Sequence, residues 1–244
     1  MSAKSAIALV AAAFVLTLIV RLPAALLSHL LPAGVQCRAA DGTLWHGACA
    51  ELRTGDIALS DVRWTLHPRS LARARLALDL QSDDARASGS AQLVLHLDGD
   101  LDIEALNASL PVQGGLTPLP AGWSGDLALA IDQASVHAHH LVSVEGTVTA
   151  RGLRSQHPAA DLGSLELRFP APAPAPAPMR ATLRDLGGPL SVRGELALAR
   201  DGSYELSGTV APRDDANPDL QQLLQLLGPA DAAGAHAFSL AGTL

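Results

Sequence analysis

Alternation of apolar and polar positions dominates the chain beyond Pro32. Apolar residues recur at every second position in five segments, at residues 76–80, 93–97, 127–131, 165–169 and 192–198. A period of two places one side of a strand against a core and leaves the other side polar. Pairs that suit tight turns lie between these segments: Asp98-Gly99, Gly114-Gly115, Gly187-Gly188 and Asp201-Gly202. The pattern predicts about ten to twelve strands, joined largely as hairpins.

Two connections in the second half of the chain have clear signals. Asp201-Gly202 predicts a hairpin between residues 190–199 and 204–210. The Ala-Pro repeat over 170–178 cannot donate ladder hydrogen bonds at every second position. A domain boundary is one interpretation of the repeat. We favour an elongated loop, because the strand pattern is the same on both sides.

A helix and a final strand are predicted near the C-terminus. Asn217-Pro218 begins the helix, whose apolar face carries five leucines, and Gly228-Pro229 ends it. We expect this helix to pack on the sheet. Residues 236–244 alternate again and predict the last strand.

The N-terminal segment is long and apolar. Lys4 precedes an apolar run over 6–20, and Arg21 is followed by a second run over 22–27. This length is enough to cross a bilayer as a helix, and the basic start predicts a cytoplasmic N-terminus. A cleaved signal peptide is the alternative, but Arg21, Leu22 and Pro23 stand where a cleavage site needs small residues. We therefore expect a retained membrane anchor.

These patterns predict a mainly β protein. The expected architecture is an N-terminal transmembrane helix, then a curved antiparallel β-sheet that forms an open half-barrel, with one short C-terminal helix. Residues 1–31 would be the cytoplasmic tip and transmembrane anchor, and residues 32–244 a periplasmic β-rich domain. The expected location is the inner membrane, with a single pass.

Composition narrows the class of partner. The formal charge is -7, and no lysine follows Lys4, which argues against nucleic acid as a partner because phosphate binding needs a concentrated basic surface. Aromatic residues make up 3% of the chain, so we expect a core of Leu, Val, Ala and Ile.

Two cysteines bracket a turn. Cys37 and Cys49 lie on either side of Asp41-Gly42, so the chains leading away from the turn could bring the two sulfurs together. We favour a disulfide, which would close a loop of thirteen residues counted from Cys37 to Cys49. Two separate buried thiols are the alternative.

Signatures of catalysis are missing. The chain contains no GxxxxGK[ST], HExxH or GxSxG motif. His137, His139 and His140 form the best candidate metal cluster, but no Cys or third spaced His follows in the same strand, so solvent-facing imidazoles are favoured. Asp214 and Asp215 are interpreted as a solvated pair. We predict no enzyme activity, no cofactor and no metal site.

Three strings carry a resemblance to a known family. They are Gly42-Thr-Leu-Trp45-His-Gly47, Val62-Arg-Trp64-Thr-Leu66-His-Pro68, and the segment from Gly194 through Asp201-Gly-Ser-Tyr204 to Gly208, followed by Leu223 to Gly228. With the terminal Phe238-Ser-Leu-Ala-Gly242, their order and spacing resemble the type II secretion system protein N family over almost the whole chain. The motif residues are Gly42, Leu44, Trp45, Gly47, Trp64, Pro68, Gly202, Tyr204, Gly208 and Gly228.

The resemblance implies a structural role. It implies a single-pass inner-membrane protein in the machinery that exports folded proteins through an outer-membrane secretin. The partners it implies are the inner-membrane platform proteins L and M, or the secretin. Trp45 and Trp64 would either fill the end of the sheet, which we favour, or expose an indole that anchors a partner.

A second family offers a rival interpretation. AsmA-like inner-membrane proteins also place a curved antiparallel sheet after one N-terminal helix. On this interpretation the concave side of the sheet binds acyl chains, and it needs a continuous exposed apolar face.

Overall fold

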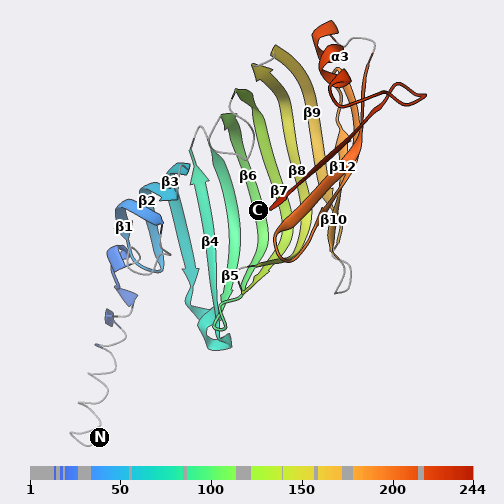
Figure 1. Ribbon diagram of the computed structural model, residues 1–244. Helices are drawn as coiled ribbons and strands as arrows, with labels where there is room; N and C mark the ends of the chain where they lie inside the picture. Colours follow the sequence, from blue (N-terminus) through green and yellow to red (C-terminus); the bar gives the residue numbers. More distant parts are fainter. Residues whose placement is uncertain are drawn as a thin grey trace, which may run out of the picture.

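The computed structural model describes residues 14, 17, 18, 20–26, 34–54, 57–84, 87–113, 122–138, 140–156, 159–171, 178–213 and 217–243. These residues form one antiparallel sheet of thirteen strands, which follow one another in sequence order from β1 at one edge to β13 at the other (Figure 1). The strands are β1 Val35–Gly42, β2 His46–Thr54, β3 Ile57–His67, β4 Arg75–Asp83, β5 Ser88–His96, β6 Leu101–Gln113, β7 Trp123–His137, β8 His140–Gln156, β9 Ala159–Phe169, β10 Met179–Asp185, β11 Leu190–Leu198, β12 Ser203–Pro212 and β13 His236–Thr243. The mainly β prediction agrees with this sheet, which has one strand more than the largest number expected.

The two faces of the sheet differ in polarity. Paired residues of an antiparallel ladder point to the same side, so the alternation within each strand becomes rows that cross the sheet. One row is apolar and runs through Gly89, Ala108, Leu129, Val148, Leu167, Leu183, Gly194, Gly208 and Phe238. A row on the opposite side is polar or small and runs through Arg63, Gln81, Ser90, Asn107, Ala130, Thr147, Arg168, Thr182, Glu195, Ser207 and Ser239. We call these sides the apolar face and the polar face.

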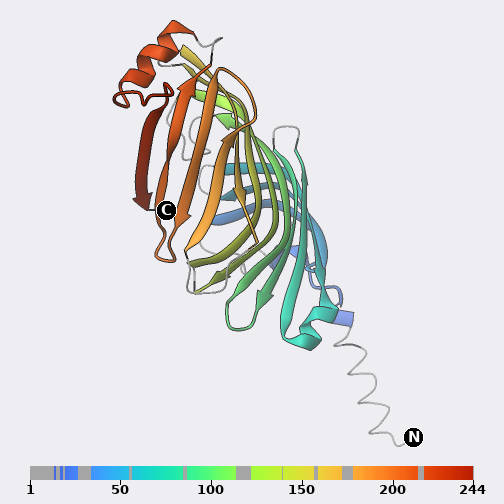
Figure 2. The ribbon, with the colours of Figure 1, turned by 90° about the vertical axis from the view of Figure 1, so that its right-hand side faces the viewer.

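The sheet is curved and open. Figures 1 and 2 show it as a trough with β1 and β13 on opposite rims, and these two strands do not pair. Helix α3 (Pro218–Gln225) packs against the apolar face beside the β13 rim and lies within the curve of the sheet. The apolar face is therefore the concave one.

Hydrophobic clusters lie toward the two rims of the apolar face. The buried members of the N-terminal cluster are Ala24, Cys49, Val62 and Trp64. The C-terminal cluster joins α3 to strands β11 and β12, and its buried members are Leu190, Val192, Val210, Leu220 and Leu224. The strands between the rims belong to neither buried cluster.

Helix α3 confirms the predicted helix but is shorter than expected. It ends at Gln225, because the next amides bond three residues back, as when Leu226 N–H donates to the Leu223 carbonyl over 3.0 Å. This tighter turn takes Leu226 and Leu227 away from the sheet, and both are exposed. Leu220 and Leu224, one helical turn apart, are buried against it.

The predicted transmembrane helix over residues 6–27 is not found. Within the part of the chain that the structure describes, no helix has the length and apolar character needed to cross a bilayer. Residues 6–13, 15, 16, 19 and 27 lie outside that part. The single-pass inner-membrane topology that we predicted from this helix is therefore corrected.

The second half of the predicted span packs on the sheet instead. Pro23 forms a β-bridge with Thr43, and the Leu44 amide donates to the Leu22 carbonyl over 2.8 Å. The short 3₁₀ helix η1 (Ala24–Leu26) follows, with Ala24 only 1% exposed in the N-terminal cluster. Pro23 cannot donate a helical hydrogen bond, so it breaks the apolar run at the point where the chain meets the sheet. Apolar composition alone did not distinguish a core-packing segment from a membrane span.

Candidate functional site

The β13 edge is the most exposed pairing surface of the sheet. Strand β13 pairs with β12 along one side, and no described strand pairs along its other side. Between His236 and Thr243 its sequence is Ala-Phe-Ser-Leu-Ala-Gly, without a charged residue or a proline. Edge strands that avoid pairing carry charges, prolines or bulges. Strand β13 has none of these charges or prolines, and Leu240 on the apolar face is 55% exposed.

The β1 edge differs from the β13 edge. Strand β1 carries Arg38 and Asp41, and the bridge between Pro23 and Thr43 lies at its end. Helix η1 also contacts β1. These charged residues and neighbouring elements reduce access to the β1 edge, so β13 is the better candidate for adding a strand from another protein.

A kink crosses the first three strands. Ala39 on β1 and Asp61 on β3 have φ angles of 55° and 51°, in the left-handed region that non-glycine residues rarely adopt. One such residue shifts the two-residue alternation, so side chains on both sides of the kink reach the same face. On β1 the more buried positions accordingly change from Val35 and Cys37 to Ala40.

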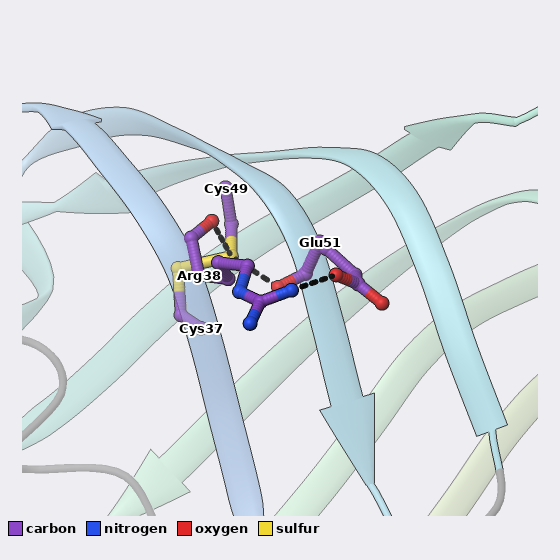
Figure 3. Close-up of a disulfide and its surroundings, with 4 residues drawn as sticks. All are labelled: Cys37, Arg38, Cys49 and Glu51. Carbon is purple, nitrogen blue, oxygen red and sulfur yellow. Dashed lines mark hydrogen bonds and ion pairs between the residues drawn. A yellow bond between two sulfur atoms is a disulfide. The ribbon is translucent and has the colours of Figure 1, made fainter.

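The kink brings Cys37 and Cys49 together. In the ladder Cys37 lies opposite Leu52 and Cys49 opposite Ala40, so the two cysteines are not directly paired. Their Cα atoms are nonetheless 5.8 Å apart, and the structure joins their sulfurs in a disulfide (Figure 3). The Cys49 sulfur is buried 3.1 Å from the Glu51 carbonyl oxygen. The bond links the edge strand to the second strand of the sheet.

Trp64 brings the N-terminal motif residues together. Its indole N–H donates to the Leu44 carbonyl over 3.1 Å, and its side chain is 4% exposed. The ring lies on Gly47, where a Cβ would also approach the Asp41 carbonyl oxygen to 2.7 Å. Trp64 therefore fills this end of the sheet and does not present an indole to a partner. Trp45 is half-buried in the same turn.

The C-terminal motif residues lie beside β13. Gly208 leaves room for the Phe238 ring, and Gly242 for the Tyr204 ring, on paired positions of β12 and β13. Gly202 forms the preceding hairpin turn with a φ of 83°. Gly228, which follows α3, offers its carbonyl to the Nδ1 of buried His236 at 2.8 Å. This group of residues shapes the β13 edge, whereas the group around Trp64 lies at the other rim.

An ion pair closes the end of the sheet next to the C-terminal cluster. Arg213 donates to Asp185 over 2.5 Å, and the Val192 amide donates to the same carboxylate over 3.1 Å. Burial raises the pKa of Asp185, but these hydrogen bonds and the Arg213 charge outweigh it, so the pKa lies below the usual value.

We expect Asp185→Asn to lower the free energy of unfolding by about 1–2 kcal/mol at pH 7. The lower value of this range allows for screening of the ion pair by solvent, because the Arg213 side chain is 39% exposed while that of Asp185 is 14% exposed. A depressed carboxylate pKa stabilises the fold above the unfolded value of about 3.9, and this contribution is lost as the pH falls through the folded value. Urea unfolding at pH 7, 4 and 3 measures the difference. Glu195→Gln, which removes an exposed ion pair with Arg180, is the matched control, and an equal loss in both variants would contradict the assignment.

For the candidate cluster of His137, His139 and His140 we predicted solvent-facing imidazoles and no metal site. His137 Nδ1 lies 2.5 Å from an oxygen of Asp100, His140 is exposed, and His139 lies outside the described residues. The described parts of the chain hold no group of three or more His, Cys, Asp or Glu that could bind a metal ion. Asp214 and Asp215 also fall outside the described parts.

The family model described as type II secretion system (T2SS), protein N, matches residues 33–239. The chain belongs to this family. It is 26% identical over 239 residues to the type II secretion system protein N of Vibrio cholerae serotype O1, covering 93% of each chain. It is 28% identical over 228 residues to that of Aeromonas hydrophila, covering 89% of each. No solved structure matches it.

The ten residues that suggested the protein N family from sequence all lie in described parts of the chain. Pro68 begins a short 3₁₀ helix after β3, and the other nine separate into the group around Trp64 and the group beside β13. Sequence reasoning missed the uncharged β13 edge, although its composition was readable once an edge position was known. It also missed the pairing of Asp185 with Arg213, because those residues are far apart in the chain and only the register brings them together.

Proposed function

We propose that this member of the protein N family is a structural part of the type II secretion machinery and holds another component by strand addition at β13. Family membership makes the chain a component of that machinery, which works with other secretion proteins. The proposed role needs a surface that binds a polypeptide without catalysis. A free strand edge offers this through backbone hydrogen bonds.

The β13 edge is the observation that carries the proposal. Eight residues without charge or proline are long enough for a ladder of backbone bonds, and the exposed Leu240 side chain adds apolar contact. The glycines beneath Tyr204 and Phe238 let those rings lie flat on the last two strands. This packing should hold β13 in place on β12 while a partner strand pairs with its free side.

We propose the platform proteins L and M, or the secretin, as the partners of this edge. They are the partners implied by the resemblance to the family, and export of folded proteins is the process in which they would meet. An envelope-associated location is part of the same proposal.

The test is a charge placed at the edge. Leu240→Lys should reduce both co-purification of the partner component and secretion of a folded substrate by about tenfold or more, because an added strand would bury the ammonium group. Ser207→Lys is the matched control: it adds the same charge one strand further in, at an exposed position of the polar face. We expect that control to secrete normally.

Two outcomes would contradict the proposal. The first is normal secretion and normal partner recovery by folded Leu240→Lys protein. The second is equal loss in both lysine variants, which would indicate a general effect of charge and not a block at the edge.

A further inference from the structure

The centre of the apolar face has no covering layer in the described chain. Of the described helices, η1 contacts β1 and α3 contacts β12, both near the rims, and a 3₁₀ helix, η2 (Pro68–Arg73), contacts β4. Between the rims, Leu129, Val148 and, on β9, Leu167 form part of a continuous apolar row and are half-buried, whereas Ile131 and Ala134 on β7 are buried. We call the part of the apolar face on β5–β8 the central apolar surface.

The exposed area of the whole chain supports this description. It is 15486 Å², whereas a compact protein of 25.1 kDa exposes about 10,000 Å². A sheet of one layer is expected to contribute to this excess. Soluble proteins rarely leave such a surface without a ligand or partner.

We propose that the central apolar surface binds the acyl chains of a phospholipid. From the pair Leu127–Ala150 to the pair Val136–Leu141, the cross-strand rows on β5–β8 place only aliphatic residues and glycine on this face, with no charged group. Such a surface is apolar like a hydrocarbon chain, and its side chains have no hydrogen-bonding groups for the polar groups of a peptide backbone. These rows also lack the Trp, Tyr and Arg anchors that dominate protein interfaces, since Trp123, the first residue of β7, lies beyond them.

The shape of the sheet disfavours a second copy as the occupant. Two concave faces brought together would enclose a space without filling it. The concave face of one copy against the convex face of another would pair aliphatic side chains with polar ones, such as Arg168 and Glu195. Flexible acyl chains can follow the curve.

The dimensions fit a lipid with two chains. Leu127 to Val136 on β7 spans about 30 Å at about 3.3 Å per residue, and four neighbouring strands extend about 14 Å across. An extended acyl chain covers about 15 Å, half the hydrocarbon thickness of a bilayer. The surface is larger than one chain needs.

Photocrosslinking of the full-length protein tests the proposal. The probe is a phosphatidylglycerol with a diazirine in one acyl chain, presented in vesicles of phosphatidylethanolamine and phosphatidylglycerol, and crosslinks are assigned to residues by mass spectrometry. We expect them on apolar-face residues such as Leu129 and Val148. Crosslinks spread equally over both faces, or none, would overturn the proposal, as would crosslinking by a diazirine fatty acid but not by the phospholipid.

A matched pair of double variants completes the test. Leu129→Gln with Val148→Gln alters a cross-strand pair of the apolar face and should reduce crosslinking by about tenfold or more. Ala130→Gln with Thr147→Gln alters the neighbouring pair of the polar face and should leave it unchanged. Equal yields from both variants would also overturn the proposal, and circular dichroism establishes that each is folded.

The lipid proposal is independent of strand addition at β13. Leu240→Lys should block partner recovery without changing crosslinking to the lipid. The wild-type crosslink map decides the lipid question even if a variant fails to fold.

Discussion

Replacing Trp64 with Ala lowers the free energy of unfolding by about 3–5 kcal/mol, the largest loss that we expect from one substitution. The indole is the largest side chain of the N-terminal cluster, and it is packed between Gly47 and the aliphatic residues of β4. Its removal leaves a cavity and an unpaired Leu44 carbonyl. The first three strands of the sheet should lose order before the rest.

Urea unfolding followed by far-ultraviolet circular dichroism measures this loss, because the signal does not depend on the tryptophan that is removed. Leu97→Ala is the control: Leu97 is apolar but 82% exposed, so we expect little change. A loss below about 1 kcal/mol for Trp64→Ala would contradict the role of Trp64 in the cluster.

Loss of the disulfide should destabilise the protein by about 3 kcal/mol on the chain-entropy model. The paired substitutions Cys37→Ser and Cys49→Ser remove the constraint across a sequence separation of 12 residues. The same bond holds the edge strand β1 to β2 across the kink at Ala39. We therefore expect β1 to show faster amide hydrogen exchange in the variant.

Reductant provides the control for this prediction. Urea unfolding of the wild type should shift to lower urea when reductant is added, and the double variant should not respond. A wild type that does not respond to reductant would contradict a stabilising disulfide.

The sheet was predictable from sequence because it depends on alternation within each strand and on turns between consecutive strands. A period of two requires only that one side of each strand be apolar, and pairs such as Asp201-Gly202 join each strand to the next. Since all thirteen strands follow in sequence order, local hairpins were enough to give the topology. The helix at Pro218–Gln225 was predictable from its capping signals and leucine spacing in the same way.

Features that depend on tertiary contacts were not predictable. The kink uses Ala39, for which no sequence pattern indicates a positive φ, and Asp61, whose residue type adopts this region more often but which lies inside a strand. The segment from Leu22 to Leu26 has the composition of a membrane span, yet a bridge from Pro23 and burial of Ala24 place it on the sheet. Only the packed structure separates these cases.

The candidate site was predictable in part. The motif residues identified the family, and the hairpin turn at Asp201-Gly202, before Tyr204, lies where the sequence predicted it. The sequence did not indicate which strand is left at an open edge, because every strand has the same alternation. The value of β13 as a binding surface follows from its position as the last strand.

Crosslinking from β13 in cells that secrete through this machinery is the most direct measurement. A photoreactive amino acid at Ser239 or Ala241 should capture another component of the type II secretion machinery, and the same amino acid at Ser207, one strand inward, should not. Mass spectrometry of the crosslinked peptide should then place a strand of the partner alongside β13. Capture from Ser207 but not from β13, or capture of no secretion component, would contradict strand addition at this edge.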